Sequence, residues 1–447
     1  MVRFVDVSRL VENLHLDTPT GIDRYEMAYV RHMLRNAGPD DVRFVVTWPH
    51  FAGLLDAADA RRIFDALDSR WSPTVQPADQ AAAFVALREA LRRPPLASHR
   101  RGALRIGRDD NGADAAATMR RAIILARSAV SPMSRRRLAA WRQTGIRYFH
   151  TSQFRLHRPR LFTWLADPAI SSLFVLHDLI PIIHPEYCRP GESERHARRL
   201  ETMARHASVI IANSHATAST LKTWLDGKNR PMPPCEVVPP GIADAFLAAG
   251  ATAPLEAATP YFVAIGTIEP RKNLAFLLQV WNRWMRGGAP RRARLVIVGR
   301  RGWENENVVD LLERSAGLAS TVIEVATLGD AAMVALLKGA NALLAPSLVE
   351  GYGLPVAEAL ALGVPVIASG IDAHREVGGA FVDYVGPTDG LGWISALEAY
   401  ADPTASRRVR RLADLRGYKP HAWGDHMAQV EAILARHNDT TLDSVAG

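Results

Sequence analysis

Short apolar segments alternate with helical segments along most of the chain, and this alternation limits the fold more than any other feature. The segments that we expect to be strands are residues 4–7, 44–47, 148–150, 173–176, 209–212 and 236–238 in the first half, and residues 261–265, 295–298, 321–325, 342–344 and 364–368 in the second. Strands that are apolar on both faces and joined by helices are typical of parallel sheets covered on both sides. The pattern therefore predicts an α/β fold made of two consecutive doubly wound halves.

The length of the chain agrees with two domains, because 447 residues exceed what one hydrophobic core usually organises. A weakly periodic segment from Pro239 to Pro260, rich in proline, glycine and alanine, predicts the linker. We expect residues 1–245 to form the first domain and residues 255–415 the second. Residues 416–447 then carry a C-terminal helix with an apolar side. The expected ligand site is the cleft between the two sheets.

The formal net charge of +8 indicates an anionic partner, which can be a nucleotide diphosphate, an acidic membrane surface or nucleic acid. Several arginine clusters lie between about residues 81 and 142, a basic helical region that we assign to the first domain. Two interpretations of this region stay open: docking on acidic lipid headgroups, or a solvated basic face. Nucleic acid is disfavoured because the clusters are not interleaved with aromatic stacking residues.

The cysteine content and the hydropathy of the chain predict where the protein works. Cys188 and Cys235 are the only cysteines, which excludes a disulfide framework and a cysteine-based zinc site. The N-terminus lacks the apolar core of a signal peptide, and no apolar stretch reaches the roughly 18 residues needed to span a bilayer. We therefore expect a cytoplasmic protein, at most attached to the cytoplasmic face of the membrane.

The run from Glu350 to Glu358 places two carboxylates eight positions apart around a glycine-bracketed turn that opens a helix. An apolar strand at residues 342–344 precedes it, Pro355 suits a first helical residue, and Gly363 suits the C-terminal end of the helix. Unpaired N–H groups at the start of the helix, together with its dipole, favour an anion there. Neutral hydroxyls are the natural partners for carboxylates beside that anion. The turn therefore predicts a site for a sugar phosphate.

The same run resembles the signature of retaining nucleotide-sugar glycosyltransferases of the family 4 type, which have two facing Rossmann-like domains in the GT-B arrangement. By that resemblance, Glu350 contacts the donor sugar and Glu358 holds the ribose hydroxyls. The remaining donor contacts that we expect from this turn involve Gly351, Tyr352, Gly353 and Leu354. The two glycines let the backbone approach the ligand closely. In the family, the C-terminal helix crosses back to pack on the first domain.

A second turn, from Gly266 to Asn273, follows the strand expected at residues 261–265 and carries Arg271 and Lys272. Arginine can grip phosphate with two donors and lysine acts as a point charge, so the pair suits a departing diphosphate. We expect Gly266 and Thr267 to contact the donor as well. Many relatives carry an arginine at the position of Thr267, and Arg271 is expected to supply that charge here.

On the first domain, His177 and Asp178 follow the strand expected at residues 173–176, at the sheet edge that opens into the cleft. The family has a histidine here near the sugar and the acceptor, although a purely structural histidine is the alternative. Gly21 and Arg24 lie in a segment that resembles the family loop closing over donor and acceptor. A plain helix start explains that segment almost as well. These four residues are our acceptor-side candidates.

Several other enzyme classes lack their motifs in this chain. There is no glycine-rich dinucleotide fingerprint after the first strand, no Walker loop and no nucleophile elbow of the α/β-hydrolases. There is also no Asp-x-Asp triplet of the kind that holds a divalent metal on a sugar diphosphate. We therefore expect a metal-independent reaction, with no cofactor besides the nucleotide-sugar donor.

The sequence thus predicts a retaining glycosyltransferase. The catalytic candidates are Glu350, His177, Arg271 and Lys272. Residues 177–187 and 266–274 look most like bacterial mannosyltransferases of O-antigen or exopolysaccharide synthesis, which implies GDP-mannose as donor and a saccharide or lipid-linked saccharide as acceptor. Two alternatives remain: a nucleotide-sugar epimerase of the same fold, or a basic protein that binds polyanions or membranes and has a degenerate sugar site.

Overall fold

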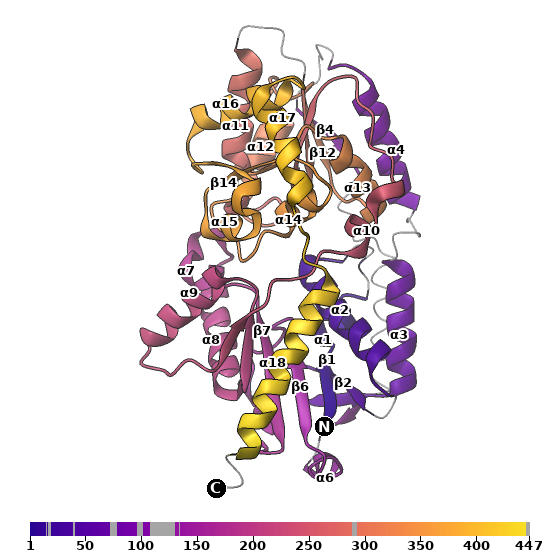
Figure 1. Ribbon diagram of the computed structural model, residues 1–447, viewed down its shortest axis with the longest axis vertical. Coiled ribbons are helices and arrows are strands. Elements are labelled where there is room, and N and C mark those ends of the chain that lie inside the picture. The colour runs from indigo at the N-terminus through magenta and orange to yellow at the C-terminus, as the bar shows by residue number, and fades with distance from the viewer. Residues whose placement is uncertain are drawn as a thin grey trace.

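The structure, a computed structural model, describes residues 1–14, 16, 19–38, 41–71, 78–95, 102–107, 130–133, 135–287 and 293–443. These residues form two α/β domains, which lie one above the other in Figure 1. Each domain is built on one mostly parallel sheet. The two-domain architecture predicted from the alternation of strands and helices is therefore confirmed.

The sheet of the first domain has the strand order β5-β3-β2-β1-β6-β7-β8-β9. Its strands are β1 (Val2–Asp6), β2 (Val42–Thr47), β3 (Ala52–Leu55), β5 (Val130–Pro132), β6 (Ile146–His150), β7 (Ile170–Leu176), β8 (Val209–Ala212) and β9 (Cys235–Val237). β3 pairs antiparallel with both β2 and β5 at one edge of the sheet, and all other neighbours are parallel. The strand order reverses between β1 and β6, whose carboxyl ends face the second domain.

Helices cover both faces of this sheet. One core lies under α1 (Ser8–Glu12), α2 (Gly21–Asn36) and α3 (Ala57–Arg70). The core on the opposite face lies under α6 (Arg135–Ala139), η1 (Pro159–Ala166), α8 (Glu192–His206) and α9 (His215–Asp226). Two short elements, α7 (Ile180–Ile183) and η2 (Pro185–Tyr187), follow β7. The strands are apolar on both sides because both sides are covered, as the sequence predicts.

The sheet of the second domain has the strand order β15-β14-β13-β10-β11-β12-β4 and is parallel throughout. Its strands are β4 (Leu104–Ile106), β10 (Tyr261–Ile265), β11 (Arg294–Val298), β12 (Val322–Val325), β13 (Ala342–Ala345), β14 (Val366–Ser369) and β15 (Asp383–Val385). One face is covered by α4 (Ala78–Arg92), α10 (Asp244–Leu247), α13 (Asp330–Gly339) and α14 (Leu354–Ala361). The other face is covered by α11 (Leu274–Arg286), α12 (Glu306–Arg314) and α16 (Gly390–Ala401).

The remaining elements of the second domain are short. They are η3 (Ala249–Ala251), η4 (Pro270–Lys272), α15 (Asp372–Gly378), η5 (Gly379–Phe381), α17 (Ser406–Asp414) and η6 (Leu415–Gly417). Of these, η4 and α15 border the candidate site described below.

A segment of the N-terminal half belongs to the second domain, which corrects the predicted boundary of residues 1–245. The strand β4 pairs with β12, and Leu87, Leu91 and Ile106 are buried in the second domain's core. Figure 1 shows α4, in the indigo of the N-terminal part, beside the upper domain. The apolar side of α4 is therefore used in packing and is not free to insert into a membrane. Most of the rest of the basic region, residues 108–129, lies outside the described residues.

The main crossover to the second domain is shorter than the predicted linker. Val238 is buried in the core of the first domain, and Ile242 is already buried in that of the second. The chain returns to the first domain beside this crossover, where the Ile242 N–H donates to the carbonyl of His421 at 2.8 Å. The helix α18 (Trp423–Asp443) then runs along the first domain (Figure 1). Its apolar side is buried there, as predicted, through Met427, Val430, Ile433 and Leu434.

Candidate functional site between the two domains

The turn before α14 has the backbone that the sequence predicts. Gly353 adopts φ +105°, a left-handed conformation that favours glycine, and α14 begins at the next residue. Pro355 lies in the first turn, where its missing N–H costs no helical hydrogen bond. Gly363, at φ +70°, follows the end of the helix. The first N–H groups of α14 therefore lie at the end of β13, facing the first domain.

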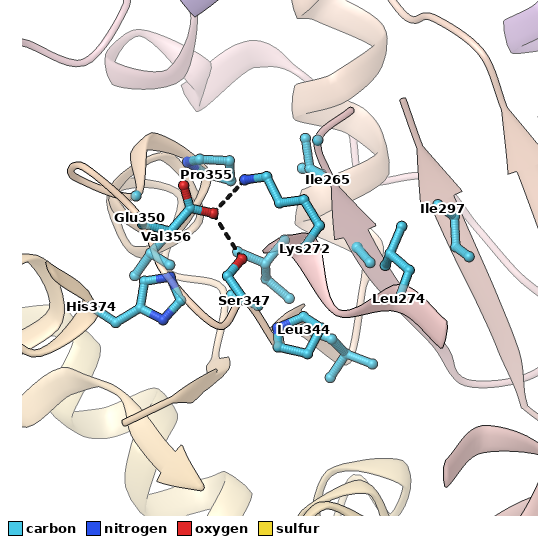
Figure 2. A pocket seen from close by; sticks show the side chains of 16 residues that line it. Ile265, Lys272, Leu274, Ile297, Leu344, Ser347, Glu350, Pro355, Val356 and His374 are labelled. Atoms are coloured by element: carbon cyan, nitrogen blue, oxygen red, sulfur yellow. Dashed lines mark hydrogen bonds and ion pairs between the residues drawn. The ribbon is translucent and has the colours of Figure 1, made fainter. Parts of the chain in front are cut away.

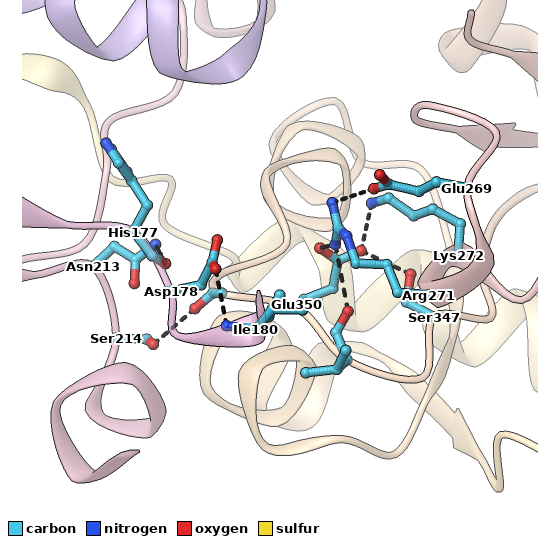
Figure 3. A network of polar contacts seen from close by, with 12 residues as sticks. His177, Asp178, Ile180, Asn213, Ser214, Glu269, Arg271, Lys272, Ser347 and Glu350 are labelled. Carbon is cyan, nitrogen blue, oxygen red and sulfur yellow. Dashed lines mark hydrogen bonds and ion pairs between the residues drawn. The ribbon is translucent and has the colours of Figure 1, made fainter. Parts of the chain in front are cut away.

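Glu350 lies in this turn and accepts hydrogen bonds from two cations of the second domain. Its carboxylate is bound by the Arg271 guanidinium and the Lys272 ammonium, and the Ser347 hydroxyl donates to it at 2.7 Å (Figures 2 and 3). Burial opposes the ionisation of Glu350, but the two cations outweigh it and hold its pKa well below the usual range. Glu350 is therefore a carboxylate at any physiological pH.

Arg271 and Lys272 lie in η4, directly after β10, as the sequence predicts. Arg271 also donates to Glu269 at 2.6 Å, so two acids hold its guanidinium. Burial lowers the pKa of Lys272, although Glu350 partly offsets this effect. Gly266 has φ +138°, and a Cβ atom there would lie 2.9 Å from Cε of Lys272. A glycine at position 266 thus leaves room for the lysine side chain to reach Glu350.

Two of the predicted donor residues pack within the second domain. The Thr267 methyl group lies against Gly302, where an added Cβ atom would come within 2.6 Å of it. Tyr352 is half-buried against the core of the domain, and burial raises the pKa of its hydroxyl. These side chains therefore pack against the second domain beside the two turns.

Glu358 lies one turn into α14 and is half-buried near an ion pair that joins the two domains. Arg24 of α2 donates two hydrogen bonds to Asp330, at the start of α13, both at 2.6 Å. Burial raises the pKa of Glu358 to about 7; Arg24 counteracts this shift and Asp330 adds to it. Gly21 lies beside the start of α14, because a Cβ atom added to Gly21 would lie 3.7 Å from Cδ1 of Leu354. Arg24, predicted on the acceptor side, therefore spans the cleft.

His177 follows β7, as predicted, but its ring is engaged in the first domain. Its Nε2–H donates to the carbonyl of Thr151 at 2.6 Å, and its edge packs against Tyr25 at 5.0 Å between ring centres. Burial lowers the pKa of His177 to about 4, so the ring is neutral at neutral pH. Figure 3 shows the ring turned away from Glu350, with Asp178 between the two.

The two domains meet directly at the turn that carries Glu350. The Ser214 hydroxyl donates to the Gly351 carbonyl at 2.8 Å, and a Cβ atom on Gly351 would lie 2.2 Å from the His177 carbonyl oxygen. Glycine at position 351 thus permits close approach of the first domain, whereas we expected it to permit approach of a ligand. Nearby, Glu376 of α15 accepts from the first N–H groups of α9, at His215 and Ala216.

A cavity of about 310 Å³ lies between the domains and has Glu350 on its wall. The residues lining it are Asp178, Leu179, Ile180, Ile183, His184, Ala216, Thr217, Thr220, Leu348, Val349, Glu350, Ile371, Asp372 and Ala373. A second, much smaller space of about 20 Å³ lies under the turn on the other side of Glu350, beside Lys272, Gly353 and His374 (Figure 2). Glu350 therefore separates an open interdomain cavity from the cation pair and the start of α14.

Four residues of the site were not among the predicted site residues: Glu269, Ser347, Asp330 and His374. The first three are neighbours of predicted residues through ion pairs or hydrogen bonds. His374 is buried beside Gly353 and donates from Nδ1 to the carbonyl of Ser369 at 3.0 Å. Glu269 and Ser347 could have been found from their places in the sequence, two positions before Arg271 and three positions before Glu350.

The described ranges hold no cluster of three or more His, Cys, Asp or Glu side chains arranged to bind a metal ion. Within those ranges, no helix combines the length and the apolar character needed to cross a membrane.

Most of the second domain is similar to a known protein family. Residues 259–398 match the family described as "Glycosyl transferases group 1". Part of the chain, 46% of it, is 31% identical to "Serotype-specific mannosyltransferase WbdA" of Escherichia coli. A shorter part, 27% of it, is 35% identical to "O-antigen chain mannosyltransferase B" of Escherichia coli. The matches span only 26% and 31% of those two relatives.

Solved structures match the fold over almost the whole chain. An α,α-trehalose-phosphate synthase from Burkholderia vietnamiensis has a TM-score of 0.57 at 13% identity and covers 97% of this chain and 99% of its own. Sucrose-phosphate synthase from Thermosynechococcus elongatus has a TM-score of 0.54 at 16% identity and covers 98% and 100%. At such low identities, the likeness concerns the fold alone. It confirms the GT-B arrangement, and the family match over residues 259–398 confirms the resemblance of the Glu350 turn to glycosyltransferases.

Proposed function

We propose that this chain, whose residues 259–398 form a glycosyl transferases group 1 domain, is a glycosyltransferase that moves a sugar from a nucleoside diphosphate to an acceptor hydroxyl. The observation that carries the proposal is the meeting of Glu350, Arg271, Lys272 and the start of α14 in one place at the interdomain cleft. The donor's diphosphate binds between the cation pair and the first N–H groups of the helix. Its sugar lies against Glu350.

The cations can bind the diphosphate without giving up their carboxylate partners. A guanidinium has five N–H donors and an ammonium three, whereas the two acids use only part of this capacity. In the reaction, negative charge grows on the departing nucleoside diphosphate. Fixed cations and a helix terminus in a partly dehydrated site stabilise that charge, which is usually the largest contribution to catalysis. The reaction therefore needs no metal ion.

Glu350 orients the donor sugar and opposes positive charge that develops on it. Its low pKa supports this role, because the group stays ionised in the site. His177 lies on the opposite, first-domain side, next to Asp178, which lines the cavity where we place the acceptor. Since its ring is bound to Thr151 and faces away from Glu350, we assign no proton transfer to it. The departing phosphate accepts the proton of the acceptor hydroxyl, which attacks from the same face and retains the anomeric configuration.

GDP-mannose is the donor that we propose. The names of the two similar curated proteins support a mannosyltransferase, and the O-antigen in one of these names supports a saccharide or lipid-linked acceptor of surface polysaccharide. Synthesis of this kind places the enzyme in the cytoplasm, at most in peripheral contact with the membrane.

The test is transfer of radiolabelled mannose from GDP-mannose to a panel of saccharide and lipid-linked acceptors, with UDP-glucose and UDP-N-acetylglucosamine as competing donors. We expect a labelled, acceptor-dependent product in the wild type and none in Glu350→Gln. An epimerase would instead change the donor sugar without an acceptor. A protein that binds polyanions only would release no GDP and would be indifferent to Glu350→Gln.

A further inference from the structure

We infer that Glu269 is a positioning residue, which holds the Arg271 guanidinium in the orientation that stabilises the departing diphosphate. The inference rests on the proposed function and assigns to Glu269 a role that the sequence does not reveal. Glu269 touches neither sugar nor phosphate in this account. It acts through Arg271.

The guanidinium of Arg271 is fixed from two sides. One terminal nitrogen donates to Glu350 and, at 3.4 Å, to the Val349 carbonyl, and the other forms an ion pair with Glu269 at 2.6 Å. The side chain of Glu269 is only 2% exposed, whereas that of Arg271 is 22% exposed. Glu269 is therefore the inner partner, and part of the Arg271 side chain remains exposed.

The backbone around Glu269 is anchored to the neighbouring strand end. The Ile268 N–H donates to the Arg300 carbonyl at 2.9 Å, and the Gly302 N–H donates back to the Ile268 carbonyl at 3.0 Å. The Asn305 amide also donates to the Ile268 carbonyl, at 3.0 Å. A carboxylate held on such a rigid support fixes its partner more precisely than one on a free loop would.

The second oxygen of Glu269, Oε2, is buried and has no hydrogen-bond partner among the described residues. An ordinary structural carboxylate is usually saturated with donors, because a buried oxygen without one is costly. Here the one strong interaction is the bond to Arg271. The buried carboxylate of Glu269 therefore acts mainly on the orientation of the Arg271 guanidinium.

Charge balance gives Glu269 a second effect on the site. Glu269 and Glu350 together match the charges of Arg271 and Lys272. If glutamine replaces Glu269, the cluster gains one net positive charge, which favours binding of the diphosphate in the ground state. At the same time, Arg271 loses its inner anchor and its alignment with the leaving group. Tighter ground-state binding combined with a misaligned cation lowers kcat rather than raising it.

The experiment compares Glu269→Gln with the wild type in two measurements. Isothermal titration gives the Kd for GDP, and steady-state transfer from GDP-mannose gives kcat and KM separately. We expect GDP to bind at least as tightly as in the wild type, while kcat falls about tenfold to a hundredfold. A kcat within twofold of the wild type would overturn the inference. So would parallel loss of kcat, GDP binding and thermal stability, which would indicate a merely structural role.

A double-mutant cycle shows whether Glu269 acts through Arg271. In an Arg271→Lys background, Glu269→Gln should lower kcat by less than twofold further, because the oriented guanidinium is already gone. Independent, multiplicative losses would contradict the inference. If Glu269→Gln does not fold, Glu269→Asp serves instead, with kcat lowered and GDP binding kept. Unchanged kcat in Glu269→Asp would count against the inference.

The matched control is Asp383→Asn. Asp383 is also a largely buried carboxylate on arginine, since it accepts from Arg407 at 2.9 Å and from Arg411 at 2.5 Å, but it lies in β15 at the edge of the sheet. We expect the kcat of Asp383→Asn and its Kd for GDP to match those of the wild type. GDP binding by the wild type tests the proposed function separately. If the wild type fails to bind GDP, the proposed function fails, whereas a wild-type-like Glu269→Gln in an active enzyme refutes only the positioning role.

Discussion

Two glutamates of one short segment contrast sharply: Glu350 lies in the turn before α14, and Glu358 lies one turn into that helix. Glu350 is held by Arg271, Lys272 and Ser347, and its pKa lies well below the usual range. Glu358 is eight positions later, and its pKa is raised to about 7. Burial disfavours ionisation at both positions. The difference therefore comes from the partners and not from depth.

At Glu350, two cations point at the carboxylate itself. At Glu358, the one nearby cation, Arg24, is already engaged by Asp330 through two hydrogen bonds. Glu350 is thus permanently charged, as a group opposing positive charge on a sugar must be. Glu358 changes its charge near neutral pH, so the contact with the donor's ribose hydroxyls that we propose for it should depend on pH. The four predictions that follow sharpen this contrast, from the largest expected effect to the smallest.

The largest effect is expected for Glu350→Gln. Gln keeps the shape and loses the charge opposite the sugar, so kcat should fall about a thousandfold. Glu358→Gln should raise KM for the donor about tenfold. Its kcat should change little, because the glutamine amide can still form hydrogen bonds with hydroxyls. Steady-state kinetics at pH 8 checks both variants. Equal losses of kcat in the two variants would remove the contrast.

The second prediction concerns Lys272, one of the two cations that bind Glu350. Lys272→Met leaves the buried carboxylate one cation short, and breaking such a pair typically costs about 3–5 kcal/mol of the unfolding free energy. The variant should also bind GDP about tenfold to a hundredfold more weakly. Chemical denaturation and titration calorimetry measure these two effects.

Lys338→Met is the matched control for this prediction. Lys338 donates to the carbonyls of Ala249 and Thr252, away from the site, and its loss should leave GDP binding unchanged. If both lysine variants bind GDP like the wild type, the diphosphate does not lie on the cation pair.

The third effect is a pH dependence at Glu358. As the pH falls through about 7, Glu358 gains a proton and its hold on the ribose weakens, so KM for the donor should rise. Glu358→Gln should remove this dependence. Stability changes in the opposite sense: because the folded-state pKa is raised above the unfolded value, the folded chain binds the extra proton. Glu358 therefore contributes stability at low pH that is lost as the pH rises through about 7.

Thermal melts of the wild type and Glu358→Gln between pH 5 and pH 8 test the second half of this prediction. The wild type should lose melting temperature relative to the variant as the pH rises. If KM and the melting-temperature difference are both flat across pH 7, Glu358 does not titrate there.

The smallest effect is expected at the interdomain ion pair, and its sign is informative. Arg24→Met removes the cation near Glu358, so the midpoint of the KM profile should move to higher pH. Asp330→Asn removes an acid and frees Arg24, so the midpoint should move to lower pH. Each shift should be about half a pH unit to one unit. Shifts in the same direction would mean that the pair only holds the domains together.

Much of the fold and part of the site could be predicted from local pattern. Five strands of the second domain, β10 to β14, were placed within one or two residues, because each is a compact apolar run between turn residues, whereas β4 and β15 were not predicted. Gly353 and Gly363 carry the left-handed conformations that a helix start and end require. The cation pair in η4 was found because phosphate chemistry needs particular residue types in a particular turn.

Long-range contacts were not predictable from local pattern. The segment containing α4 and β4 reads as part of the first half, yet its apolar side matches the second core. Gly351 looked like a glycine for ligand approach, whereas its neighbour is the His177 carbonyl of the other domain. Asp330 and Arg24 are 306 positions apart in the sequence, and nothing local pairs them. Such features arise only when two surfaces meet.

The most direct test of this account is the crystal structure of the protein with GDP-mannose bound. We expect the diphosphate within hydrogen-bonding distance of Arg271, Lys272 and the backbone N–H of Leu354, the mannose hydroxyls on Glu350 and the ribose on Glu358. A diphosphate bound away from the cation pair and the start of α14, or a sugar that does not contact Glu350, would contradict it.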